Sequence, residues 1–491
     1  MITRSKKKGS ITIFGLWVMI LVAEFLLMLL DAARYWELKR VAELQSRTAI
    51  EAVFANYCKP LWMEYHLLAA KQEDMETLLK YYGNPNDVLE AEEVSFLKYV
   101  LSDVSIQSYT VITDNDGVIF VKSVADYMKN NLLYETAKLI YGQYEALSQI
   151  TNSGSEAFGD IDEAIEGLEE LAKEEKDSTS RGLSSKPRKI SSKEDNPLTQ
   201  VKKLEDVGVL ELVIEDEDTI SSKKCDLTDA VSNRNREEGI ASADEQMDWI
   251  DRILLQQYLV TYFSSYGNEK ESHALSYELE YLIAKKDSDV ENLKNIVRQL
   301  LFVRQAANMV YLLSDTAKMQ EIQLLASAIG GASMNPALGE VVKVALITAW
   351  AFGESVLDVR ALMQGKRVAL LKSKELWTLE LSEIGTLLDG YTMAKESPVG
   401  LSYKDYLGIF LLGVSPSKLA MRAMDMQEKT INTVEGYEAL RFDHLICEAS
   451  VEFTYSYENV FDIFHFLERA GELPKEFKIK SSYRYSREEV H

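Results

Sequence analysis

The chain has 491 residues, of which 46% are hydrophobic and 10% aromatic, enough apolar side chain to bury the core of one or more folded domains. Its 54 basic and 78 acidic residues give a formal net charge of -24 at pH 7, and that charge repels polyphosphate backbones. The composition excludes a chain that is disordered throughout and argues against nucleic acid as a partner.

The N-terminal segment changes abruptly from basic to apolar. Residues 11–30 contain one charged side chain and, as a helix, would span about 30 Å, the thickness of a bilayer's hydrocarbon core. A cleaved signal peptide has a shorter apolar stretch of about 7–15 residues, so we predict an uncleaved transmembrane helix. Four basic residues in segment 1–10 predict that this tail is cytoplasmic and that the rest of the chain is extracytoplasmic. These topology determinants are Arg4, Lys6, Lys7 and Lys8.

Three ionisable residues lie in or beside the apolar run. A charged, unpaired Glu24 would cost several kcal/mol in the bilayer, so this residue either is tolerated as a neutral acid or faces a partner helix or a cation. Asp31 and Arg34 are three residues apart on one helical face, where they can pair or reach the headgroups. We interpret all three as residues of membrane-helix assembly or of the membrane interface.

The segment after the membrane helix predicts a stalk followed by strands. Residues 31–59 contain no Gly or Pro and repeat apolar residues at spacings of three and four, which is typical of an amphipathic helix. Residues 60–171 form the first part of the predicted ectodomain. Within them, two β-rich stretches flank Asp116 and Gly117 and predict one hairpin or a pair of strands.

The remaining chain divides by composition. Residues 172–196 are almost entirely polar and predict a disordered linker, residues 197–231 an ordered island, and residues 232–246 a flexible loop. Residues 247–486 predict a helical ectodomain that ends in strands, because helical periodicity gives way to alternation. The predicted fold is therefore α+β, mostly α: a helical bundle with a small antiparallel sheet from segments near 94–122 and 444–486.

The sequence contains no motif for catalysis or for ligand binding. Its five histidines are isolated, and neither a phosphate-binding glycine loop nor a nucleophile elbow is present. We therefore predict no catalytic site, no cofactor and no metal. Charged residues within the helical region are better explained as buried ion pairs that join helices than as a catalytic carboxylate site. The candidates are Glu278, Glu280, Arg304, Glu354, Asp358 and Arg360.

Two parts of the chain carry a family resemblance. The N-terminal GSITIF, the apolar helix, and Asp31, Ala33 and Arg34 at its end resemble the TadE/TadG-like pseudopilins of the tight-adherence (Tad, or Flp) pilus system. Ectodomain phrases such as NPLTQVKKL and WAFGESVLDVRALMQGK are similar to large membrane-anchored proteins associated with that pilus. The sequence departs from a prepilin cleavage site, because the fifth residue after Gly9 is Phe14 where a Glu is usual.

The resemblance implies a non-enzymatic, pseudopilin-like component of a Tad/Flp-type pilus or related secretion apparatus, with an extracytoplasmic domain for assembly or display. Its implied partners are the membrane lipid bilayer and other pilin-like or Tad apparatus proteins. The alternative is a stand-alone membrane-anchored protein whose extracytoplasmic domain binds a cell-wall component or a ligand.

Overall fold

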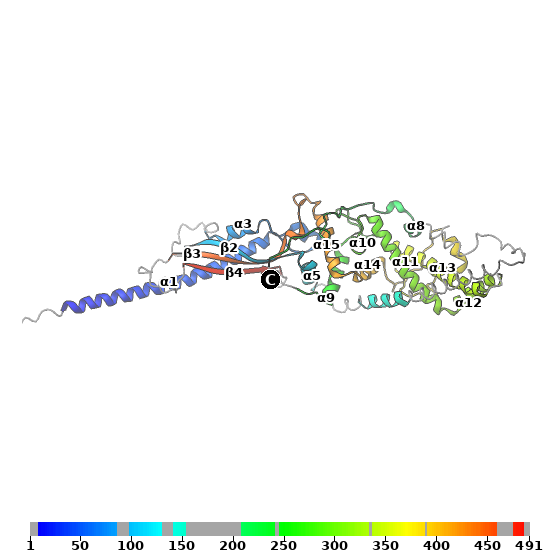
Figure 1. Ribbon diagram of the computed structural model, residues 1–491, viewed down its shortest axis with the longest axis horizontal. Helices are drawn as coiled ribbons and strands as arrows, with labels where there is room; N and C mark the ends of the chain where they lie inside the picture. The colour runs from blue at the N-terminus through cyan, green and yellow to red at the C-terminus, as the bar shows by residue number, and fades with distance from the viewer. Residues whose placement is uncertain are drawn as a thin grey trace, which may run out of the picture. The chain divides into compact units, whose positions relative to one another are not determined.

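The computed structural model describes residues 8–85, 98–129, 141–153, 208–240, 245–332, 336–387, 390–458 and 475–485. The described part is mostly helical with one small antiparallel sheet, which confirms the predicted α+β, mostly α class (Figure 1). Arg4, Lys6, Lys7 and the predicted linker 172–196 lie outside the described residues.

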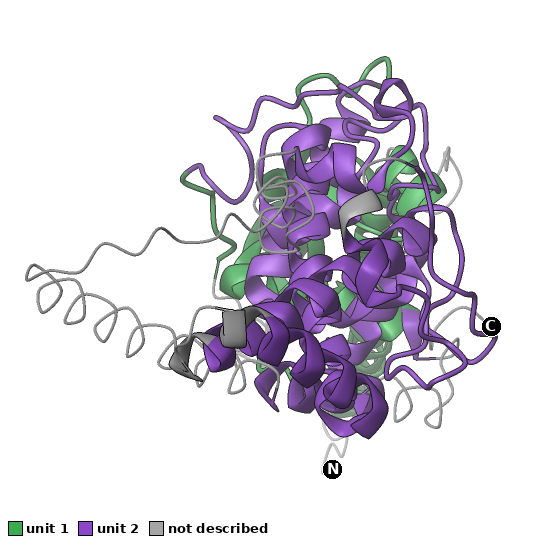
Figure 2. Ribbon diagram, turned by 90° about the vertical axis from the view of Figure 1, so that its right-hand side faces the viewer, with its two compact units in different colours: residues 1–127, 235–247, 434–491 green, residues 128–234, 248–433 purple. Residues whose placement is uncertain are grey.

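The chain folds into two compact units (Figure 2). Unit 1 comprises residues 1–127, 235–247 and 434–491, and unit 2 comprises residues 128–234 and 248–433. The predicted division into consecutive segments therefore differs from the structure, in which residues 434–486 belong with the N-terminal part. The reason is strand pairing between segments far apart in the sequence, which composition along the chain does not reveal.

Helix α1 (Lys8–Ala55) is one continuous helix of 48 residues. At 1.5 Å per residue it is about 72 Å long, so the predicted membrane and stalk helices are a single element. Lys8 lies in its first turn. The helix stops before the predicted residue 59, and α2 (Lys59–Tyr65) begins after Cys58 with a proline in its first turn, where proline is tolerated.

In the sheet of unit 1, each of the other three strands pairs with β3 (Leu445–Tyr457). β3 pairs antiparallel with β2 (Tyr99–Val111) on one side, and with β4 (Glu476–Arg484) and the short β1 (Ala70–Lys71) on the other. Buried and half-buried residues alternate along β3, as expected for a strand with one covered face.

Two helices cover the apolar face of this sheet. α1 and α3 (Met75–Gly83) contribute to one core with β3 and β4 (Figure 1). Leu38, Ala42 and Phe54 of α1 are almost fully buried in this core, which also contains Phe453 and Tyr455 of β3. The second half of α1 is thus stabilised by packing on the sheet, whereas helix propensity alone contributes little.

The predicted hairpin around Asp116 and Gly117 is wrong. β2 ends at Val111, and the chain then makes a left-handed turn in which Asn115, Asp116 and Gly117 have φ of 52°, 51° and 83°. Asn, Asp and Gly tolerate this conformation best. From residue 118 the chain is helical within α5 (Asp114–Met128). A short apolar run fits a buried helix as well as a strand, so the sequence alone did not decide between them. The strand that pairs with β2 is β3.

Unit 2 is a helical assembly in its described part. Side-chain caps fix several helix starts: Ser288 accepts a hydrogen bond from Glu291 N, and capping boxes join Asp248 to Asp251 and Ser402 to Asp405. Its helices are α8 (Val209–Val213), α9 (Trp249–Tyr262), α10 (Glu278–Ala284), α11 (Asp289–Ser314), α12 (Thr316–Ala332), α13 (Pro336–Met363), α14 (Tyr403–Leu412) and α15 (Pro416–Ile431). Short 3₁₀ turns are η2 (Glu217–Thr219) and η3 (Leu381–Thr386) in unit 2 and η4 (Phe442–His444) in unit 1.

The predicted flexible loop at 232–246 makes specific contacts in its described residues. Arg234 pairs with Glu428 at 2.5 Å, and Ser232 N donates to Asp425 at 2.8 Å, both within unit 2. In unit 1, Tyr109 N donates to Ile240 O at 3.1 Å. The segment lacks extended regular structure, as predicted, but it is held to the fold by hydrogen bonds that its polar composition did not reveal.

Candidate functional site

The first half of α1 is an exposed apolar surface. Large hydrophobic side chains between Ile13 and Leu30 are 42% to 73% exposed, whereas soluble proteins rarely expose contiguous apolar patches of this extent. Among the helices of the described residues, α1 is the one long and apolar enough to cross a membrane. Glu24 lies half-exposed within this surface.

Burial of α1 begins at one residue. Leu30 is 49% exposed, and the next residue, Asp31, is 2% exposed. Arg34 lies 4.0 Å from Asp31 and donates a hydrogen bond of 2.6 Å to the Glu458 carbonyl oxygen. Of the two predicted alternatives, pairing with each other or reaching lipid headgroups, the structure shows the pair inside unit 1, where the Glu458 carbonyl supplies a further acceptor for Arg34.

Aromatic packing fixes the same point of the helix. The Tyr35 ring lies 5.6 Å from the Tyr457 ring and 5.9 Å from the Phe477 ring, between centroids. The Arg34 guanidinium also lies 6.0 Å from the Tyr457 ring centroid. We call Asp31, Arg34, Tyr35, Tyr457 and Phe477 the helix junction, because here α1 changes from an exposed apolar rod to a buried part of unit 1.

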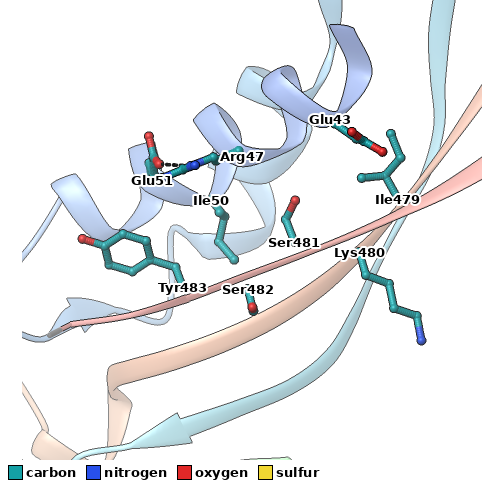
Figure 3. A pocket seen from close by; sticks show the side chains of 9 residues that line it. All are labelled: Glu43, Arg47, Ile50, Glu51, Ile479, Lys480, Ser481, Ser482 and Tyr483. Atoms are coloured by element: carbon teal, nitrogen blue, oxygen red, sulfur yellow. Dashed lines mark hydrogen bonds and ion pairs between the residues drawn. The ribbon is translucent and has the colours of Figure 1, made fainter. Parts of the chain in front are cut away.

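A groove of about 350 Å³ lies beside the second half of α1 (Figure 3). α1 contributes Glu43, Arg47, Ile50 and Glu51, and β4 contributes residues 479–483. Arg47 and Glu51 form an exposed ion pair at 2.7 Å, drawn as the dashed line in Figure 3. The lining is polar and open, which suits weak surface contacts better than the enclosure of a small molecule.

In unit 2, predicted ion-pair residues on α11 and α13 do meet. Arg304 donates to Asp358 at 2.9 and 3.0 Å, and Lys372 bridges Asp358 and Glu354 at 2.7 Å each. Asn308 donates at 2.9 Å to the Asp358 oxygen that also accepts from Arg304. These side chains are almost wholly buried, so the four charges neutralise one another within the helical core.

The pKa values of the two carboxylates of this cluster shift in opposite directions. Burial raises the pKa of Glu354, and the Lys372 charge compensates only in part. Burial acts the same way on Asp358, but the charges of Arg304 and Lys372 outweigh it and hold the pKa of Asp358 below its ordinary value. Asp358 is therefore held as an anion between two cations.

The other predicted ion-pair residues bond differently. Glu278 contacts His273 Nδ1 at 2.7 Å, and Glu280 accepts from Tyr403 Oη at 2.7 Å. Arg360 donates to backbone carbonyls at 2.8 to 3.2 Å. The acceptors are Leu212, Leu387, Gly390 and Thr392. Within the described part of the chain the prediction of an ion pair is wrong for Glu280 and Arg360, since tyrosine and backbone groups satisfy them.

Sequence reasoning missed several partners in unit 2. Lys372 lies in a loop after α13, Tyr403 is the first residue of α14, and His273 lies in a loop before α10. None of them shares a helix with the carboxylate that it contacts. The buried Lys372 had one available signal, because it occurs in a segment with apolar neighbours. Backbone acceptors such as those of Arg360 leave no signal in the sequence.

The described residues give no sign of metal or thiol chemistry. No group of three or more His, Cys, Asp or Glu side chains in these residues is placed to hold a metal ion. Cys58, Cys225 and Cys447 are buried free thiols, and burial raises the pKa of each. Thiols of raised pKa are poor nucleophiles.

A comparison with protein families gives one match. A model described as a family of unknown function (DUF5702) matches residues 187–457, which include the charged clusters of unit 2 and not α1. No curated protein and no solved structure matches the chain. The matched residues make up more than half of the sequence, and the chain therefore belongs to the DUF5702 family, a family of unknown function.

Proposed function

We propose that the chain is a membrane-anchored, pseudopilin-like component of a Tad/Flp-type pilus or related secretion apparatus, with no catalytic role. The observation that carries this proposal is the division of α1 at Asp31 into an exposed apolar half and a half buried against an antiparallel sheet. Such a helix serves at once as anchor and as spine of the folded unit. The resemblance of the N-terminal segment to TadE/TadG-like pseudopilins supports the assignment to a Tad/Flp-type pilus or related secretion apparatus.

The orientation follows from charge. Basic residues precede the apolar half of α1, and cytoplasmic flanks of membrane helices carry an excess of Lys and Arg. The N-terminus is then cytoplasmic and both units are extracytoplasmic. A non-enzymatic role is supported by the buried clusters of unit 2, because Arg304, Asp358 and Lys372 bond to one another or to other groups of the chain.

Protease added to cells without a wall tests the orientation. We expect digestion of both units and survival of a short membrane fragment that contains the apolar half of α1. Permeabilised cells provide the control for protease activity. Full protection of both units in intact cells, with digestion after permeabilisation, would contradict the proposed orientation.

Glu24→Leu tests the assembly role. Removal of a carboxylate favours insertion into hydrocarbon, so membrane yield should stay equal or rise. Co-purification of pilus or secretion components should fall, because the polar contact with a partner helix is lost. Val22→Leu, in the same exposed stretch, is the matched control and should change neither quantity. Unchanged recovery of every partner in the Glu24 variant would remove the assembly role of this residue.

One observation favours a second candidate, a stand-alone anchored binding protein. The groove beside α1 and β4 offers a surface for a cell-wall component or another ligand (Figure 3). Binding of the Arg47→Ala variant to isolated cell wall separates the pilus component from the binding protein. Lys39→Ala, on the same helix but outside the groove, is the control. Loss of retention on isolated cell wall in the Arg47 variant alone, with Glu24→Leu silent, would favour the binding protein.

A further inference from the structure

We infer that unit 1 rests directly on the bilayer, with Trp36 in the headgroup layer beside the helix junction. This inference rests on the proposed membrane anchor and names the lipid surface as a second contact. Trp36 is 66% exposed although it follows the buried Asp31 by five residues and the buried Arg34 by two. Packing within unit 1 therefore does not explain a tryptophan at this position.

The distance along α1 places Trp36 at the right depth. It is six residues beyond Leu30, the last exposed residue of the apolar stretch, and six residues of helix rise about 9 Å. Headgroup layers extend roughly 5–8 Å on each side of the hydrocarbon core. Side chains of a helix lean toward its N-terminus, so the indole lies nearer the hydrocarbon core than the Trp36 backbone does. This lean and a helix tilt together bring the indole into the layer where tryptophan is enriched in membrane proteins.

The neighbours of Trp36 suit phospholipid headgroups. Lys39 Nζ lies 5.8 Å from the Trp36 ring centroid, and the exposed Arg40 pairs with Glu37 at 2.8 Å. An indole with adjacent ammonium and guanidinium groups can meet ester carbonyls and phosphates together. Because this surface continues the exposed apolar face of α1 without a gap, the bilayer that receives residues before Asp31 also receives Trp36.

The helix junction extends this contact to the sheet. Tyr35, next to Trp36, packs on Tyr457 and Phe477, which end β3 and begin β4. The end of the sheet therefore lies at the height of Trp36 along α1. No linker separates the apolar half of α1 from unit 1, so the unit cannot lift away from the membrane without unpacking the junction.

Fluorescence of the full chain in liposomes tests the inference. Three proteins are compared: wild type, Trp36→Phe, and Trp36→Phe with Leu44→Trp. Leu44 is 61% exposed on α1 and about 12 Å beyond Trp36, so a tryptophan there reports on water. Quenchers are lipids brominated near the headgroup end of the chain, lipids brominated deep in the chain, and aqueous iodide.

We expect the shallow brominated lipid to quench Trp36→Phe less than wild type. The double variant with Leu44→Trp should show the same low quenching by this lipid and additional quenching by iodide. Trp17, 60% exposed in the apolar stretch, should be quenched by the deep lipid in all three proteins. Iodide quenching of Trp36 equal to that of Leu44→Trp, with Trp17 still lipid-quenched, would overturn the inference and leave the anchor intact. If the deep brominated lipid failed to quench Trp17, the anchor itself would be overturned.

Discussion

At the scale of single residues, Arg304 has the most demanding environment in unit 2. It is fully buried, donates twice to Asp358, and also donates to Tyr406 Oη and the Leu370 carbonyl. Removal of one partner from a buried ion pair leaves an uncompensated charge, which typically costs about 3–5 kcal/mol.

Arg304→Met should therefore lower the free energy of unfolding of unit 2 by an amount of that order. Denaturant titration in detergent, followed by a probe in unit 2, measures the change. Arg298→Met is the matched control, since Arg298 lies exposed on the same helix α11 and its loss should change stability by less than about 0.5 kcal/mol. Equal effects of the two substitutions would mean that the buried cluster contributes no specific stability.

Glu280 gives unit 2 a dependence on pH. Burial raises the pKa of this carboxyl to about 7, and hydrogen bonds from Tyr266 N and Tyr403 offset burial only in part. An acid with a raised pKa binds its proton more tightly in the folded state, so its contribution to stability is full below its ordinary pKa of 4.5 and is lost as pH rises through 7.

The slope of stability against pH is the measurable consequence. Between pH 5 and 8 the free energy of unfolding should decline by up to about 3 kcal/mol through this residue, and Glu280→Gln should flatten that decline. The exposed Glu321 provides the control, because Glu321→Gln changes a side chain that stays in water in both states. An unchanged slope in Glu280→Gln would show that Glu280 is ionised in the folded protein at neutral pH.

At the scale of elements, the turn between β2 and α5 depends on a close backbone approach. Gly239 N donates to Asp114 at 3.1 Å, and the other oxygen of Asp114 accepts from Val111 N at 2.9 Å. A Cβ at position 239 would overlap the Tyr109 carbonyl oxygen and lie 2.6 Å from the Asp114 carboxylate. Only glycine fits here without displacement of the segment that follows.

Gly239→Ala should therefore destabilise unit 1 by more than 1 kcal/mol and increase exchange of the Tyr109 amide, whose hydrogen bond to Ile240 would break. Amide hydrogen exchange and thermal unfolding measure both effects. Gly390→Ala is the control, since a Cβ there meets nothing within 4 Å. Equal stability and equal Tyr109 exchange in the two variants would contradict the close approach.

Some helices and strands were predictable from the sequence and others were not. α1 was predictable because twenty consecutive apolar residues have few structural solutions, and β3 and β4 because alternation specifies a half-covered strand. The run at 118–121 was predicted as a strand and is helical, because four consecutive apolar residues fit either periodicity. Within the predicted helical region, residues 403–431 form two helices, α14 and α15, which Gly413 and Pro416 separate.

The candidate site was less predictable than the fold. Asp31 and Arg34 were found from their spacing, but their burial depends on Glu458, which lies more than 400 residues away in the chain. Lys372 reaches Glu354 and Asp358 through a loop without periodicity. Such contacts are decided by tertiary structure, so residue types and spacing identify the ionisable groups and leave their partners open.

At the scale of the whole molecule, β3 connects the two ends of unit 1. Phe453 is fully buried in the core that α1 and α3 share with the sheet. Phe453→Ala should cost about 3–5 kcal/mol and increase amide exchange along residues 38–54 of α1, because that half of the helix is stabilised by the sheet. Hydrogen exchange followed by mass spectrometry gives the effect for each segment.

Thr454→Ala is the matched control for this prediction, since Thr454 is the next residue of β3 and lies half-buried on the opposite face. Its exchange pattern should match the wild type. Protection of residues 38–54 that survives in the Phe453 variant would mean that α1 forms a stable helix without the sheet.

The interleaved path of unit 1 has a consequence for biosynthesis. Phe54 and the strands that cover it are separated by about 390 residues of nascent chain, which a ribosome needs about 20–80 s to synthesise at 5–20 residues per second. In the proposed membrane-anchored topology, α1 is already in the membrane during that interval, while the apolar flank of its second half has no sheet to cover it. Chaperones on the extracytoplasmic side would then protect this flank, and a ribosome that stalls before Leu445 would leave an anchored but unfolded product for membrane proteases.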